Sequence, residues 1–487
     1  MLKQKIIISL CVLSLVLPFA GCSKKKADSS VSADSFVLPY SSEDSINPYS
    51  CDSCNLYLSE LIYDSLFTIN TQHEPEANLA EGYISEDNTI TVTLKQTLFS
   101  DGSELTSDDV IHSFNQAKQC ERYQTALSCI TSAQRKGSSV VRFTLINQNV
   151  YALNLLTFPI LSQKNNNIGT GYYALEQKDG AYTLLYNKNH EGNKPKNTDI
   201  SLVECTDYAE ADKLFDAEQI DVLFQDAQDI ISGTNATQTK SAKLNNLVFL
   251  GLNSKKGLLK NKAFRNAVSL CINQSELCQS AMNGYGIATA TPFDPDWSEI
   301  GSIVANSVLS NTKQAKRAFA ASGCKYDKMG ISLLFKDKPI TLSLIVNSAS
   351  NIKIALAEQI KTELINCGIA VEVKKMPLDE YNIAIENESF DMYIGEVKIP
   401  NDFNFDCFFV NGGGADFGIQ STPLWQTYAD FKTGKASIQD FVSAFCEQNP
   451  LIPICYKCAA VRMSADLQSA DNITENCYFP HIEEWSK

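Results

Sequence analysis

A strand–helix–strand pattern at residues 340–373 is the feature that most constrains the fold of this chain. Residues 340–346 and 369–373 are apolar runs that predict strands, and residues 351–366 between them have the spacing of an amphipathic helix. Cys367 and Gly368 provide a stop signal for that helix. Two strands joined through a helix are expected to lie parallel, with a right-handed crossover. The pattern therefore predicts α/β architecture.

Strands and helices alternate through the rest of the chain as well, which predicts an α/β fold throughout. Thr106 and Asp109 have the spacing of a capping box, so we expect a helix from there to about Lys118. The further predicted elements are strands at 36–40, 89–94, 246–253 and 450–454 and helices at 58–67 and around 263–267. A length of 487 residues suggests two to four domains.

The first residues predict export. Lys3 and Lys5 precede an apolar run at residues 6–17, which is shorter than the roughly 20 residues a transmembrane helix needs. Small residues before Cys22 resemble a lipobox, so we expect residues 1–21 to be a signal peptide and Cys22 to be lipidated. Residues 22–35 would be a flexible tether. Ordinary secretion with an unmodified Cys22 is the alternative interpretation.

Charge and cysteine content narrow the function. The net charge of −15, and −17 once the two lysines of residues 1–21 are removed, argues against nucleic-acid binding.

Of the 16 cysteines, 14 remain when Cys11 in the expected signal peptide and Cys22 at the expected anchor are set aside. The pairs Cys51/Cys54 and Cys455/Cys458 have CxxC spacing, but the four histidines are scattered and add no metal-site spacing. We expect buried apolar thiols or structural bridges, with no metal and no cofactor.

No motif predicts catalysis. The chain has no GxSxG elbow, no HExxH and no Walker loop. Two other interpretations stay open: an exported hydrolase that uses a cysteine, and an adhesin-like or sensory lipoprotein that binds a protein partner.

A set of motifs, in order along residues 36–460, resembles the family 5 extracellular solute-binding proteins, which are the oligopeptide, dipeptide and nickel receptors of ABC importers. The most specific segment is residues 99–110, FSDGSELTSDDV, which is similar to the family signature FSDGxxLTxDDV. The supporting segments are Asn47-Pro48-Tyr49, residues 61–67 (LIYDSLF), 78–83 (NLAEGY), 169–172 (GTGY), Asn253 with 264–267 (FRNA), and 450–453 (PLIP).

The resemblance implies a class II periplasmic-binding-protein-like fold of two lobes joined by a hinge. Lobe one would contain residues 36–252 and 456–487, with an extra subdomain at about 50–160, and lobe two residues 253–455. Such a receptor captures a small peptide in an interlobe cleft and delivers it to ABC permease subunits. The resemblance therefore also implies that the protein is not an enzyme. We expect a monomer, lipid-anchored on the outer side of the cell membrane. A nickel chelate or a small anion is the alternative ligand.

The resemblance also implies ligand-binding positions. Peptide-binding members hold the ligand's ammonium with an aspartate in the segment that corresponds to residues 390–402, so Glu396 or Asp402 would take that role here. Lys398 would suit a carboxylate or another anion, or would be a surface lysine. Val397 beside it is a further expected ligand contact. Trp297 is either a stacking surface or a core residue. The opposite wall of the cleft would be formed by Ser42, Glu43 and Asp44.

Overall fold

The computed structural model describes residues 35–51, 54–178, 181–225, 238–304, 310–410, 412–420 and 422–487. The expected signal peptide of residues 1–21, Cys22 and the tether up to residue 34 lie outside the described residues. Residues Ser35–Lys487 form one compact unit. Within the described part of the chain, no helix is both long and apolar enough to cross a membrane.

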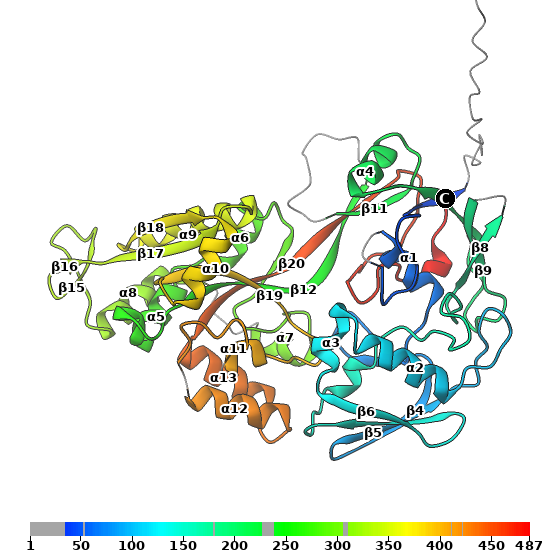
Figure 1. Ribbon diagram of the computed structural model, residues 1–487. Coiled ribbons are helices and arrows are strands. Elements are labelled where there is room, and N and C mark those ends of the chain that lie inside the picture. Colours follow the sequence, from blue (N-terminus) through cyan, green and yellow to red (C-terminus); the bar gives the residue numbers. More distant parts are fainter. Residues whose placement is uncertain are drawn as a thin grey trace, which may run out of the picture. The chain divides into compact units, whose positions relative to one another are not determined.

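The largest sheet is built around two long antiparallel strands, β12 (Gln238–Leu252) and β20 (Leu451–Met463), which lie side by side in Figure 1. The strand order is β11-β20-β12-β19-β17-β18, and β13 pairs with β20 at residues 455–457. The predicted strands at 246–253 and 450–454 are parts of these longer strands, because the pairing continues through polar stretches that hydropathy does not mark. The other strands are β11 (Val222–Gln225), β13 (Gly286–Ala288), β17 (Thr341–Asn347), β18 (Ala370–Met376) and β19 (Met392–Lys398).

The predicted strand–helix–strand unit is confirmed. Strands β17 and β18 pair in parallel, and helix α9 (Asn351–Asn366) connects them. The Ser350 hydroxyl caps this helix by accepting a hydrogen bond from the Lys353 backbone N–H, at 3.3 Å. Gly368 follows the helix with a φ of 88°, and a Cβ there would lie 2.9 Å from the Ile331 carbonyl oxygen. A side chain at this position would therefore meet both backbone strain and a steric clash.

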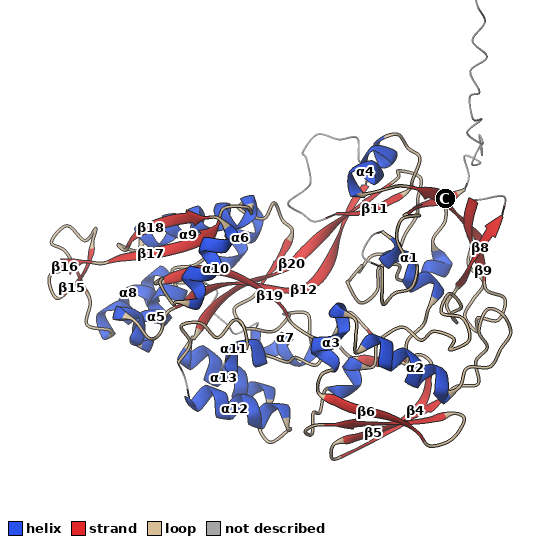
Figure 2. Cartoon of the chain, viewed as in Figure 1, coloured by secondary structure: helices blue, strands red, loops and turns tan. Residues whose placement is uncertain are grey.

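Apolar cores cover both faces of the large sheet, because alternate residues of a strand point to opposite sides. In β19, Met392 and Ile394 belong to one core and Tyr393 to the other. Figure 2 shows the helices that pack around these strands. The first core contains residues of α5 (Lys262–Ser269), α6 (Gln274–Ser280), α8 (Thr312–Ala321) and α9. The second contains residues of α7 (Ser298–Val304), α10 (Leu378–Glu386), α11 (Asp406–Phe409), α12 (Thr422–Lys432) and α13 (Ile438–Gln448).

A four-stranded sheet holds the first described strand of the chain. The predicted strand at 36–40 is confirmed as β1 (Phe36–Tyr40), which pairs in parallel with β10. The order is β1-β10-β9-β8, and helices α1 and α4 (Tyr208–Asp216) belong to the same half of the chain. The remaining strands are β8 (Tyr173–Lys178), β9 (Ala181–Tyr186) and β10 (Asp199–Glu204).

The predicted helix at 58–67 is wrong in its bounds. Helix α1 is Asn55–Ile62, and Phe67 begins strand β2 (Phe67–Ile69). Tyr63 is extended, and the Ile62 carbonyl accepts a hydrogen bond from the Gly171 backbone N–H at 2.9 Å instead of continuing the helix. This contact is over 100 residues away in sequence, so local periodicity does not reveal it.

A separate core is formed by residues from the range 66–160. Its main sheet has the strand order β4-β5-β7-β6. Strands β2 and β3, which precede this sheet in the sequence, pair as a separate two-stranded sheet. The predicted capping box is confirmed, because the Thr106 backbone N–H donates to Asp109 Oδ2 at 2.9 Å at the start of α2. The elements are β3 (Pro75–Ala77), β4 (Ala80–Glu86), β5 (Thr89–Leu94), α2 (Ser107–Ala117), α3 (Glu121–Leu127), β6 (Ile130–Arg135) and β7 (Val140–Leu145). A small sheet elsewhere contains β14 (Lys325–Tyr326), β15 (Leu333–Phe335) and β16 (Lys338–Pro339).

Candidate functional site

A polar hollow of about 370 Å³ opens where β17 ends and α9 begins. This volume is within the range that small-molecule sites occupy. Strands β12, β19 and β20 each contribute one side chain to it. The lining residues are Val248, Met282, Asn347, Ala349, Ser350, Ile352, Lys353, Leu356, Glu396 and Lys457.

The local sequence places the charged groups of this hollow. Lys353 lies in the first turn of α9, at the position whose backbone N–H is capped by Ser350. Glu396 lies two residues beyond Ile394 in β19, on the same face of the strand, so it points to the side where the first core ends. Lys457 reaches the same place from β20.

These three side chains form one ionic cluster. Glu396 lies 2.9 Å from Lys353 Nζ and 3.9 Å from Lys457 Nζ, and it accepts a hydrogen bond from Asn246 Nδ2 at 2.9 Å. Burial alone would raise the pKa of Glu396, but the two lysines and Asn246 outweigh it and lower that pKa. The Lys457 side chain is only 11% exposed and the Lys353 side chain 24%. Two ammonium groups, one carboxylate and a helix N-terminus together favour an anionic group of a ligand.

The other expected residues of β19 do not share this hollow. Val397 points to the opposite face of the strand and packs against the second core. Lys398 is 59% exposed and pairs with Glu475 at 3.3 Å. Of the three adjacent residues expected to bind ligand, Glu396 is the one that the structure places in the hollow, and ligand binding by all three stays a prediction.

Asp402 is buried in a polar contact with the segment around residue 149. Lys432 Nζ lies 2.9 Å from its Oδ2, and Asn149 Nδ2 donates to the same oxygen at 2.8 Å. The Asp402 side chain is 1% exposed, and among the described residues its Oδ1 has no hydrogen-bond partner. The neighbouring Asn401 accepts from Asn154 Nδ2 at 3.0 Å through its carbonyl oxygen. Residues 149–154 therefore hold the loop that carries Asp402.

Trp297 packs in the second core. It is 2% exposed and stacks on Phe403, with ring centroids 3.8 Å apart and an interplanar angle of 16°. Tyr151 contacts the same indole edge-on at 5.6 Å. These contacts support the core interpretation of Trp297 over the ligand-stacking one.

The expected opposite wall, Ser42 to Asp44, makes local contacts. The Ser42 hydroxyl donates to Glu204, and Asp44 Oδ1 accepts from the Ser45 backbone N–H at 2.8 Å. Glu43 is exposed. None of Ser42, Glu43 and Asp44 is among the residues that line the polar hollow, so their contact with ligand stays a prediction.

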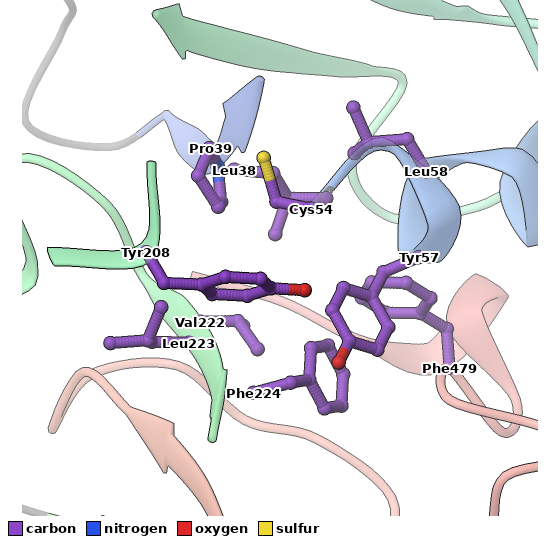
Figure 3. A pocket seen from close by; sticks show the side chains of 10 residues that line it. All are labelled: Leu38, Pro39, Cys54, Tyr57, Leu58, Tyr208, Val222, Leu223, Phe224 and Phe479. Atoms are coloured by element: carbon purple, nitrogen blue, oxygen red, sulfur yellow. The ribbon is translucent and has the colours of Figure 1, made fainter. Parts of the chain in front are cut away.

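A second hollow lies in the other half of the chain, beside β1 and α1 (Figure 3). Its volume of about 10 Å³ is room for roughly one water molecule. Figure 3 shows the rings of Tyr57, Tyr208 and Phe224 facing into it, with Cys54 nearby. It lacks converging charged groups among its lining residues, so the polar hollow is the better candidate for a ligand site.

Sequence reasoning missed Lys353, Lys457 and Asn246. Two signals were present in the sequence. A serine cap directly after a parallel strand places Lys353 in the first helical turn, at the strand end where α/β folds bind ligands. Lys457 interrupts the apolar run at residues 451–461, and a lysine in such a run needs an acidic partner. Asn246 gave no such signal.

The comparisons with known proteins agree with this architecture. The sequence model of the bacterial extracellular solute-binding proteins, family 5 (middle region) matches residues 74–413. The oligopeptide-binding protein AppA of Bacillus subtilis (strain 168) is 25% identical over 417 residues, which covers 75% of this chain and 74% of that protein.

Solved structures share the fold. The nickel ABC transporter protein from Bacillus halodurans has a TM-score of 0.73 at 15% identity, covering 89% of this chain and 95% of its own. NikZ from Campylobacter jejuni, in complex with Ni(L-His), has a TM-score of 0.62 at 20% identity, covering 94% and 100%. These likenesses confirm the predicted α/β, periplasmic-binding-protein-like fold. The family match adds the role of an extracytoplasmic substrate-binding protein of an ABC importer. This chain therefore belongs to the bacterial extracellular solute-binding proteins of family 5.

Proposed function

We propose that this receptor captures a small peptide and delivers it to the permease subunits of an ABC importer. The relative with 25% identity is an oligopeptide-binding protein, which supports a peptide ligand. The proposal includes a monomer anchored to the cell membrane by a lipid on Cys22, with residues 1–21 removed. It includes no catalytic step.

The polar hollow is the proposed subsite for the carboxylate end of the peptide. The observation that carries this proposal is the two partly buried lysines, Lys353 and Lys457, that line the hollow beside Glu396. The first backbone N–H groups of α9 lie beside them. A ligand carboxylate would form charge-assisted hydrogen bonds there.

Strands β12 and β20 are the proposed hinge. Their long pairing connects the part of the sheet that contains β11 with the part that contains β13 and β19. In the proposed two-lobe arrangement, lobe one is residues 36–252 with 456–487, and its subdomain of about 50–160 contacts lobe two (253–455) through Asn149 and Asp402. A ligand that contacts both lobes would stabilise the closed arrangement by its differential affinity.

A small anion is the second candidate ligand. The same two lysines and helix N-terminus favour it, without any contribution from a peptide backbone. A peptide and an inorganic anion are distinguished by experiment, because only a peptide presents a carboxylate that can be converted to an amide.

Native mass spectrometry of the purified protein tests the ligand class. We expect a bound population that releases a ladder of small peptide masses on denaturation. A single non-peptide mass would keep the receptor role and contradict the peptide. If the purified protein carries no ligand, thermal-shift screening against tripeptides, phosphate and Ni²⁺ replaces the first measurement. Stabilisation by phosphate or Ni²⁺ but not by tripeptides would contradict a peptide ligand.

Cell fractionation tests the anchor. We expect the wild-type protein in the membrane fraction and a Cys22→Ser variant in the soluble exported fraction. Equal distribution of the two proteins would contradict lipidation at Cys22.

A further inference from the structure

Three pairs of cysteines that are distant in sequence lie close together inside the protein. Fourteen cysteines belong to the described residues. The Sγ atoms of Cys54 and Cys205 are 3.6 Å apart, although the residues are separated by 151 positions. Both side chains are buried, with exposures of 6% and 2%. Cys54 precedes α1 and Cys205 follows β10, so this contact connects two segments of the first half of the chain.

The second pair, Cys278 and Cys455, lies behind the polar hollow. Both Sγ atoms lie 3.2 Å from the position that a Cβ on Gly286 would take, which places the two sulfurs around one point. Cys455 Sγ also lies 3.1 Å from the sulfur of Met282, which lines the hollow.

The third pair, Cys271 and Cys367, lies between the end of α5 and the end of α9. Both side chains are buried in the first core, and the Cys367 thiol raises the pKa of Cys271. The two segments are close, because the Asn273 backbone N–H donates a hydrogen bond to Glu363 Oε2 at 3.0 Å. Cys367 is the residue that ends α9, immediately before Gly368. This pair therefore joins the helix of the strand–helix–strand unit to its neighbour in the same core.

We propose that these three pairs are disulfides in the exported protein: Cys54–Cys205, Cys271–Cys367 and Cys278–Cys455. The family acts outside the cytoplasm, where disulfides form and persist. In each step two thiols lose two protons and two electrons to a disulfide-carrying donor, which is reduced to its dithiol. The two sulfurs of each pair must approach to about 2 Å of each other. We expect the bonds to form during folding, since the buried thiols are not accessible afterwards.

The pairing leaves the proposed hinge free. Cys54 and Cys205 belong to one core, and the other four cysteines belong to another. Within the proposed boundaries, each bond stays inside a single lobe. The bonds would make the lobes rigid while the lobes still move relative to each other. A bond between Cys278 and Cys455 would also fix the wall of the hollow behind Met282.

Peptide mapping of the full chain tests the proposal. The protein is exported from a bacterium, unfolded without reductant, alkylated and digested, and the peptides are analysed by mass spectrometry. We expect three cross-linked peptides that join the named cysteines, each lighter by about 2 Da than the sum of its two free peptides. Alkylation of all six thiols, or cross-links between other partners, would overturn the proposal.

Thermal unfolding with and without reductant gives a second measurement. We expect the reductant to lower the Tm of the wild-type protein and to lower it less in the Cys54→Ser/Cys205→Ser variant, which has one bond fewer. The matched control is Cys446→Ser, since Cys446 is exposed and belongs to none of the pairs; it should respond to reductant like the wild type. A wild-type Tm that does not respond to reductant would overturn the proposal.

Discussion

The Oδ2 atom of Asp294 lies 2.9 Å from Nε2 of His73, a residue 221 positions earlier in the chain. Both side chains are almost fully buried, and Lys243 Nζ lies 3.3 Å from the same carboxylate oxygen. Burial alone would raise the pKa of Asp294, but the hydrogen bond from His73 and the charge of Lys243 outweigh it and lower that pKa. This contact connects the segment before β3 with the segment after β13.

We expect Asp294→Ala to lower the free energy of unfolding by about 3 kcal/mol at pH 7, because it leaves His73 and Lys243 without their buried partner. Asp296→Ala is the matched control: Asp296 also pairs with Lys243 but is 57% exposed, so its loss should cost less than about 1 kcal/mol. Urea unfolding measures both values. Because the pKa of Asp294 is lowered in the folded state, its ionised carboxylate stabilises that state above pH 4, and this stabilisation is lost in acid. The difference in free energy of unfolding between wild type and Asp294→Ala should therefore narrow below pH 4. Equal costs for the two variants would contradict the account.

Trp297→Ala should destabilise the protein by about 3–5 kcal/mol, because it removes a stacked and buried indole from the second core. Peptide affinity, measured below the unfolding transition, should not change. Trp425 is 38% exposed, so Trp425→Ala serves as the control with little effect on stability. A folded Trp297→Ala protein that has lost peptide affinity would show that Trp297 contacts the ligand.

Glu363 provides a pH-dependent stability test. Burial raises the pKa of this carboxyl to about 7, although it accepts a hydrogen bond from the Asn273 backbone N–H at 3.0 Å. A raised carboxyl pKa means that the folded state prefers the neutral form, so stability is lost as pH rises from about 4.5 to 7. We expect Glu363→Gln to be more stable than wild type at pH 8 and similar to it at pH 4. The exposed Glu386→Gln is the control, with no pH-dependent gain. A Glu363→Gln protein without a gain at pH 8 would contradict the raised pKa.

Lys353→Met should weaken peptide binding by about 10- to 100-fold, because a hydrogen bond to a charged group contributes about 1.5–3 kcal/mol. Lys398→Met removes an equal charge two residues from Glu396, but Lys398 points to Glu475 and is exposed. We therefore expect at most a small change in affinity for Lys398→Met. Isothermal titration calorimetry of the two variants makes the comparison. A larger loss in Lys398→Met than in Lys353→Met would place the ligand beside Lys398 and Glu475 instead of in the polar hollow.

Local sequence signals predicted much of the fold. The capping box of Thr106 and Asp109 and the unit at residues 341–376 depend on contacts between near neighbours or on hydrophobic periodicity, and the structure confirms both. The end of α1 at Ile62 was not predictable in this way, since it depends on a hydrogen bond from Gly171. The same holds for the contact of His73 with Asp294.

The candidate site was predicted in part. Glu396 was named because a family resemblance pointed to its segment, and the structure places it in the polar hollow. Its partners Lys353 and Lys457 come from elements that are 43 and 61 residues away from it in the chain, and only the sheet order brings them together. Asp402 was predicted from the same segment, but the sequence does not reveal that Lys432 and Asn149 surround it.

The most direct test of the account compares a tripeptide with its C-terminal amide by calorimetric titration of the wild-type protein and of Lys353→Met. The tripeptide is the one that stabilises the protein most in the thermal-shift screen. We expect the amide to bind the wild type at least about 10-fold more weakly, since it cannot pair with the lysines of the hollow. The difference should be much smaller in Lys353→Met. Equal affinities of the wild-type protein for the peptide and its amide would contradict the carboxylate subsite.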